Sequence, residues 1–216
     1  MMAPQAREKI SRRGWLMAGF TIPLFRARAA AALTVSSDGD SLYVAAPQLH
    51  FLTGRPLVRL MDGNTVVFLS QITLFGDANH MTMIRKQPEQ ITVSYAIWDE
   101  KFKVVLDTVE IAAHTIDRRS AKDLSLSQTE TWCMQNLAIS ALGLEPARPF
   151  WLRFELRSAN ERDLSSVRSE GGISIRGLIE AFSHRAGNDE FHRSLEAGPL
   201  RLIDLPRTVI RRTHNG

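Results

Sequence analysis

Alternating apolar and polar residues mark the middle of the chain as β-structure. Residues 91–97 read ITVSYAI, which places the large apolar side chains at every second position, the spacing of a strand with one buried face. Residues 102–106 continue the alternation after the charged pair Asp99-Glu100. Two such strands joined by a short polar segment are typical of a β-hairpin. We therefore predict a hairpin from Ile91 to Asp107.

Two further segments carry strong strand patterns. Residues 65–75 (TVVFLSQITLF) are apolar at both odd and even positions, which is typical of a central strand covered on both faces. Residues 150–157 (FWLRFELR) alternate strictly, so one face of that strand should be buried and the other wet. Shorter strands are predicted at 42–51, 80–86 and 198–205.

The remaining patterned segments predict three helices. A short helix is expected within residues 53–63. A longer one is expected at 127–142, because Ser127 and Glu130 have the Ser-x-x-Glu spacing of a capping box at a helix start. A third is expected at 174–186, where apolar residues recur at the i, i+3, i+4, i+7 spacing of a buried helical stripe.

The order of these segments predicts the fold class. Consecutive strands joined by tight turns pair antiparallel, because a parallel pair needs a crossover of a dozen or more residues. We expect an α+β fold, mainly an antiparallel β-sheet or sandwich of about six to eight strands, with two longer helices and one short helix on one face or end.

Residues 1–29 have the layout of a secretory signal peptide. Basic residues come first, an apolar run from Trp15 to Phe25 follows, and the small residues Ala27 and Ala29 mark a cleavage region. This run would span about 16 Å as a helix, against about 30 Å for the hydrocarbon core, so no stable membrane span is expected after cleavage. The predicted parts are the signal peptide (1–29), a single exported domain (30–206) and a basic flexible tail (207–216).

The residues Ser11, Arg12, Arg13 and Leu16 resemble the twin-arginine signal of bacterial exported proteins. Trp15 departs from that pattern, which usually has Phe there. The resemblance implies a periplasmic or extracellular protein that is recognised by the twin-arginine export machinery. Export by the general secretory route and a chance basic-apolar start remain the alternatives.

Removal of this segment changes the charge of the chain. Residues 1–29 carry six basic residues and one acidic residue, whereas the whole chain has a net charge of +4. The remainder therefore carries about −1, and the basic isoelectric point of the full chain gives no reason to expect nucleic-acid binding. Cys133 is the only cysteine, so no disulfide can form within the chain. We expect a buried structural thiol, with a reactive thiol as the alternative.

No pattern for catalysis, cofactor binding or metal binding stands out. The six histidines form no His-x-His, His-x-x-x-His or His-Glu-x-x-His pair, and the sequence has no glycine-rich phosphate loop. Ser174 lies in a spacing that differs from a nucleophile elbow, and Asp99-Glu100 reads as a charged turn. The sequence therefore predicts no catalytic, cofactor-binding or metal-binding residue, although a site assembled from distant residues remains open.

A candidate contact surface lies on the predicted wet face of residues 150–157. Trp151, Arg153 and Arg157 share that face, and an aromatic ring beside guanidinium groups can stack on a sugar or hold an anion. Trp98, at the end of the predicted hairpin, is a second candidate. The alternative is that a helix covers the tryptophan and that the arginines pair with acids.

The stretches FLTGRPLVRLMDGNTVVFLSQITLF and ITVSYAIWDEKFKVV resemble a family of exported bacterial proteins of unknown function, over roughly Leu42 to Leu156. The family supplies no catalytic residues, and the resemblance implies a non-enzymatic envelope protein. We expect an exported protein that binds an unidentified envelope protein or small ligand. The alternatives are a periplasmic enzyme, hydrolytic or carbohydrate-directed, and a structural subunit of an envelope complex.

Overall fold

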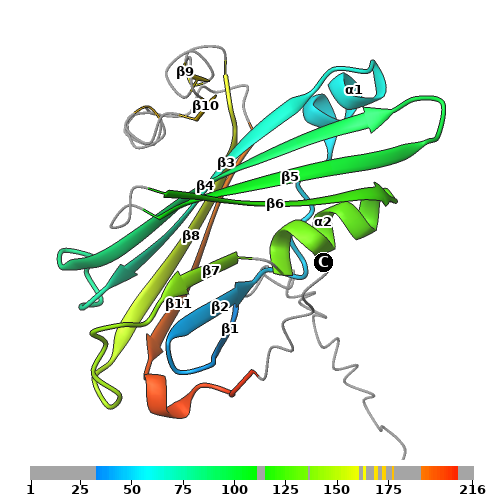
Figure 1. Cartoon of the computed structure of the whole chain (residues 1–216). Coiled ribbons are helices and arrows are strands. Elements are labelled where there is room, and N and C mark those ends of the chain that lie inside the picture. The colour runs from blue at the N-terminus through cyan, green and yellow to red at the C-terminus, as the bar shows by residue number, and fades with distance from the viewer. Residues whose placement is uncertain are drawn as a thin grey trace, which may run out of the picture. The chain divides into compact units, whose positions relative to one another are not determined.

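A six-stranded sheet is the largest element of the structure, a computed structural model (Figure 1). Its strands lie in the order β11-β8-β3-β4-β5-β6, and every neighbouring pair is antiparallel. The strands are β3 (Val66–Phe75), β4 (Met83–Ala96), β5 (Lys101–Glu110), β6 (Thr115–Leu124), β8 (Phe150–Ser158) and β11 (His192–Leu200).

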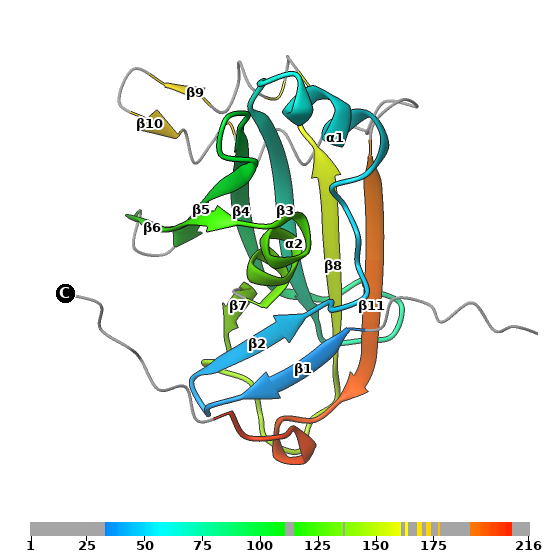
Figure 2. The same cartoon turned by 90° about the vertical axis from the view of Figure 1, so that its right-hand side faces the viewer.

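A three-stranded antiparallel sheet, in the order β1-β2-β7, and the helix α2 lie over one face of the large sheet (Figure 2). Apolar residues of α2, β2 and β7 form one buried cluster with that face, which we call the inner face. The predicted fold class, α+β and mainly antiparallel β, is confirmed. The remaining elements are β1 (Thr34–Ser37), β2 (Ser41–Ala45), α1 (Gly54–Met61), α2 (Leu126–Gln135), β7 (Leu137–Ser140), β9 (Arg168–Ser169), β10 (Gly172–Ile173) and the 3-10 helix η1 (Leu202–Asp204).

The structure describes residues 33–110, 115–135, 137–160, 163, 168–169, 172–173, 177 and 191–208. All of them belong to one compact unit, Ala31–Gly216. The predicted signal peptide, nearly all of the third predicted helix and most of the tail lie outside the described residues.

The central strands agree with the sequence pattern. β3 is buried at nearly every position and pairs with β4 and β8, as a strand apolar on both faces should. β4 and β5 form the predicted hairpin from Ile91 to Asp107. The segments predicted separately around residues 80–86 and 91–97 are a single strand, which continues through Pro88 opposite Gln71.

The predicted helix at 127–142 is wrong in both its start and its length. α2 begins one residue earlier, and its capping box is Ser125 and Gln128: the Ser125 N–H donates to Gln128 Oε1 at 2.8 Å, and the Gln128 N–H donates to Ser125 Oγ at 3.4 Å. The helix ends at Gln135. Residues 137–140 then form β7, because pairing with β2 satisfies their backbone groups and buries Leu137 and Ile139.

Of the remaining elements, the short helix was predicted correctly, whereas two strands were missed and one was predicted too late in the chain. The short helix at 53–63 is confirmed as α1, and Gly63 follows it with a positive φ of 80°. β1 and β6 were not predicted, and β11 begins six residues before the predicted last strand. These strands are short or rich in exposed polar residues, so they lack the apolar alternation from which a strand is recognised.

Candidate binding surface

Arg153 is the centre of a side-chain cluster on the outer face of the large sheet, the face opposite the core. Its Nε donates to Glu196 Oε1 at 2.7 Å, and its Nη2 lies 2.6 Å from His80 Nδ1. A guanidinium can only donate, so Nδ1 of His80 is the acceptor. The guanidinium carbon also lies 5.3 Å from the ring centroid of Phe75, within cation–π distance. We call Phe75, His80, Arg153 and Glu196 the Arg153 cluster.

The turn between β3 and β4 holds His80 in this cluster. The Asp77 carboxylate accepts backbone N–H bonds from Asn79 at 3.0 Å, Met81 at 3.1 Å and Thr82 at 2.6 Å. These bonds, chiefly the one from Met81, lower the pKa of Asp77 because they favour its charged form. His80 has a positive φ of 57° inside this turn, and its ring lies 4.6 Å from that of Phe75.

Trp151 lies beside the Arg153 cluster but is half-buried. The strand that covers it is β11: a Cβ added at Gly198 would lie 2.3 Å from Trp151 Cδ1. Gly198 also has a φ of 153°, so both its backbone conformation and the close approach of the indole require glycine. The prediction that Trp151 points to the outer face is correct, but its ring packs against a strand as well as facing solvent.

Arg157 does not belong to this surface, and its prediction as a solvent-facing contact residue is wrong. Its side chain is buried, and Nη1 and Nη2 donate to the two carboxylate oxygens of Asp163 at 2.7 and 2.9 Å. Asp163 is also fully buried, and it accepts the backbone N–H of Asn160 at 3.1 Å. The pair is a buried structural link, since a buried charge requires a partner and hydrogen bonds.

Trp98 is 97% exposed in the turn between β4 and β5. The Arg153 cluster includes His80 from the turn at the opposite end of β4, which is 14 residues long. At a rise of about 3.3 Å per residue, the two ends of this strand are roughly 40 Å apart. The structure therefore brings Trp151 and Arg153 together but leaves Trp98 at a separate place.

Apolar side chains that the sequence did not single out are exposed near the Arg153 cluster. Met81 is 84% exposed and Leu142 65%, and Met83 and Ile84 are also exposed. One hollow of about 250 Å³ lies between the β3–β4 turn and the loop that precedes β8. It is lined by Ile84, by Thr82 (between Met81 and Met83) and by Gly143 (next to Leu142). We call Met81, Met83, Ile84 and Leu142 the hairpin patch. The run MTMI directly after a turn was the only sequence signal for it.

Arg85 fixes the two halves of the hairpin patch together. Its guanidinium donates to the carbonyl oxygens of Ser140 and Leu142, both at 3.1 Å. Gly76 closes the turn, where its N–H donates to the Thr82 carbonyl at 2.8 Å. The exposed apolar residues are therefore held on hydrogen-bonded backbone.

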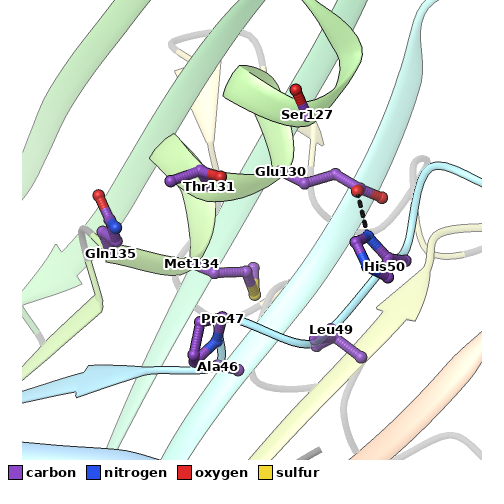
Figure 3. A pocket seen from close by; sticks show the side chains of 9 residues that line it. All are labelled: Ala46, Pro47, Leu49, His50, Ser127, Glu130, Thr131, Met134 and Gln135. Carbon is purple, nitrogen blue, oxygen red and sulfur yellow. Dashed lines mark hydrogen bonds and ion pairs between the residues drawn. The ribbon is translucent and has the colours of Figure 1, made fainter.

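A second hollow, of about 80 Å³, lies between α2 and the segment that leads into α1 (Figure 3). Glu130 of α2 is buried beneath it. Its Oε1 accepts the backbone N–H groups of Phe51 and Leu52, both at 2.8 Å, and its Oε2 lies 2.7 Å from His50 Nδ1. The prediction that Glu130 caps the helix is wrong, because its side chain satisfies two N–H groups about 80 residues away instead.

His50 presents its ring to this second hollow, and its side chain is 67% exposed. Because a carboxylate only accepts, Nδ1 carries the proton toward Glu130, and Nε2 is left outside this bond, an acceptor in the neutral ring and a donor in the protonated one. The Ser127 hydroxyl points away from the His50 ring (Figure 3). The arrangement orients a histidine without aligning that serine as a nucleophile, so it fits binding better than acyl transfer.

The inner face also buries a titratable group within the sheet. Glu89 is fully buried between Ser70 and Thr108, whose hydroxyls donate to it at 3.1 and 3.2 Å. Loss of solvation raises its pKa to about 7, against the lowering effects of Arg119 and these two hydrogen bonds. Cys133 is buried nearby, as predicted, and burial raises the pKa of its thiol, which makes it a poor nucleophile.

Within the part of the chain that the structure describes, no group of three or more His, Cys, Asp or Glu side chains is placed to hold a metal ion. No helix among those residues combines the length and apolar character that a membrane span requires. In comparisons with protein-family models, curated proteins and solved structures, nothing matches this chain.

Proposed function

We propose that the protein is an exported binding module of the bacterial cell envelope, which contacts a protein partner through the hairpin patch and the adjoining Arg153 cluster. Export is supported by the twin-arginine pattern at Ser11, Arg12, Arg13 and Leu16, with the small residues of the cleavage region behind it. The proposal is therefore of a protein that works in the periplasm or outside the cell, with the twin-arginine machinery as its first partner.

The hairpin patch is the observation that carries the binding proposal. Two methionines, an isoleucine and a leucine are exposed, and Ile84 and residues next to the other three line one hollow. Contiguous exposed apolar residues of this kind are typical of a binding surface. Methionine side chains are flexible and polarizable, and they are common at protein-binding surfaces. The Arg153 cluster supplies the charged and aromatic neighbour that the rim of a protein interface typically has.

The state of the polar groups also favours a binding module over an enzyme. Arg153, Arg85 and Glu130 each form hydrogen bonds with other groups of this chain, and these bonds rigidify the surface around them. A rigid surface loses little conformational entropy on association. Catalysis would require several polar groups that converge on a substrate in a concave pocket, and the hollow at the hairpin patch, of about 250 Å³, is smaller than the roughly 300–1,000 Å³ of a typical ligand pocket.

Photo-crosslinking in the native cell envelope tests this proposal. A photoreactive residue at position 83 should give a defined crosslinked species, and the same residue at position 115, on the exposed edge strand β6, should not. When Met81→Asp is added to the chain with the photoreactive residue at position 83, the crosslink should disappear. Folding should be unaffected, because residue 81 is almost fully exposed. Equal crosslinking from both positions, or none from position 83, would reject the hairpin patch as the contact surface.

A further inference from the structure

The solvent-facing side of α2 has no charged residue. Its exposed residues are hydroxyl and amide side chains, and the one charged residue of the helix, Glu130, is turned inward and buried. Exposed helix faces usually carry several charged residues, which keep a surface soluble. The exposed side chains are Ser127, Gln128, Thr131 and Gln135.

Hollows lie on both sides of this stripe. The hollow of about 80 Å³ separates it from residues 46–50, and another of about 310 Å³ lies between it and Leu124 and Trp132. Ser127, Thr131 and Gln135 line both hollows, so the two are parts of one continuous surface that crosses the helix. That surface is lined by residues of α2, of the end of β6 and of the segment before α1, and Figure 3 shows its smaller hollow.

The chemistry of this surface suits a ligand with many hydroxyl groups. Hydroxyl and amide side chains both donate and accept hydrogen bonds, as sugar hydroxyls do. The half-buried Trp132 lines the larger hollow, and an indole offers an apolar face of the size of a sugar ring. On the other side, Nε2 of the exposed His50 ring takes no part in the bond to Glu130 and can form a hydrogen bond with a ligand hydroxyl, which both donates and accepts.

The lining also decides the charge of the ligand. Among the described residues, no lysine or arginine, the side chains that typically bind an anion, lines either hollow, and the Glu130 carboxylate is already engaged by three donors. A protein partner would be expected to meet a more apolar surface with aromatic or arginine anchors. We infer that the solvent-facing side of α2, with His50 and Trp132 at its two edges, is a binding site for an uncharged oligosaccharide. This site is separate from the hairpin patch and does not depend on it.

A glycan array that carries neutral and acidic oligosaccharides, probed with the purified full chain, tests this inference. Binding to at least one neutral glycan is expected, followed by calorimetric titration with that glycan. Thr131→Ala and Gln135→Ala should each weaken its affinity about threefold to tenfold, the effect of losing one hydrogen bond. Both residues are exposed, so the variants should fold normally. Ser194→Ala, an exposed hydroxyl on β11, is the matched control and should leave the affinity unchanged.

Nuclear magnetic resonance locates the site independently of affinity. Among the tryptophan indole N–H signals, that of Trp132 should shift on titration with the neutral glycan, whereas that of the exposed Trp98 should not. The inference is overturned if no neutral glycan binds, if only acidic glycans bind, or if binding is the same in the Thr131 and Gln135 variants as in the native chain.

Discussion

Glu89 makes the stability of the protein depend on pH. Its pKa is about 7 in the folded protein and 4.5 in its ordinary state, so the folded protein holds this proton more tightly. The stabilisation is complete below pH 4.5 and is lost as the pH rises toward 7. In this window Glu89 should make the free energy of unfolding fall by up to about 1.4 kcal/mol per pH unit, and Glu89→Gln should remove this contribution.

Urea unfolding between about pH 4.5 and pH 8 measures this dependence. The free energy of unfolding of the native chain should fall with pH more steeply than that of the Glu89→Gln variant. Asp99→Asn, at an exposed turn position, is the control and should follow the native curve. Parallel curves for the native chain and Glu89→Gln would mean that Glu89 titrates as in the unfolded chain.

The buried pair Arg157–Asp163 should be far more sensitive to substitution than the half-exposed Arg153–Glu196 pair. Arg157→Ala leaves the buried carboxylate of Asp163 without its cation and should cost about 3–5 kcal/mol of unfolding free energy. Arg153→Ala removes a more exposed ion pair and should cost about 1 kcal/mol or less. Chemical denaturation of the two variants measures the difference, and similar losses would contradict the contrast in burial.

For single residues, the sequence predicted on which face of the sheet a side chain lies better than whether that side chain is buried. Alternation correctly placed Trp151 and Arg153 on the outer face of β8. It could not reveal that Arg157, on the same face, is buried, because its partner Asp163 lies beyond the end of the strand. Nor could it show that Glu130 reaches Phe51, since that contact joins segments about 80 residues apart.

Among the elements, α2 and the segment before α1 are joined by the hydrogen bonds of Glu130 as well as by apolar packing. Glu130→Ala leaves two buried N–H groups without an acceptor and should cost about 2–4 kcal/mol of unfolding free energy. His50→Ala removes an exposed partner of the same carboxylate and should cost less than about 1 kcal/mol. Thermal or chemical denaturation of both variants measures this, and equal costs would show that the backbone bonds to Glu130 carry little stability.

Strands with an apolar pattern were predicted from the sequence, and strands without one were not. β8 and the β4–β5 hairpin are recognisable because their buried residues recur at every second position, and β3 because it is apolar on both faces. β6 reads TIDRRSAKDL, in which exposed polar residues suit an edge strand and discourage edge-to-edge association. Residues 137–140 were predicted as helix, and they form β7 instead because pairing with β2, 93 residues upstream at Val44↔Leu137, overrides the local pattern.

For the whole molecule, the central question is the route out of the cytoplasm. Arg12→Lys together with Arg13→Lys keeps the charge but removes the guanidinium pair that the twin-arginine pattern requires. Cell fractionation should then find the uncleaved chain in the cytoplasm, whereas Arg7→Lys with Arg28→Lys should leave export intact. Normal export of the Arg12/Arg13 variant would exclude the twin-arginine route.

The fold class of the whole molecule was predictable from the order of its segments, because short connections enforce antiparallel neighbours. The second sheet was not, since β1, β2 and β7 come together from two distant parts of the chain. The hairpin patch became visible only when the β3–β4 turn and the loop around Leu142 were found on the same hollow.

Native mass spectrometry of the protein recovered from its own cell envelope tests the central claim most directly. The proposal predicts a chain that begins near residue 30, bound to a protein partner, and a free chain that begins at the same residue when Met81→Asp is introduced. An uncleaved chain would contradict export. A native chain recovered alone, or a complex that Met81→Asp leaves intact, would contradict binding through the hairpin patch.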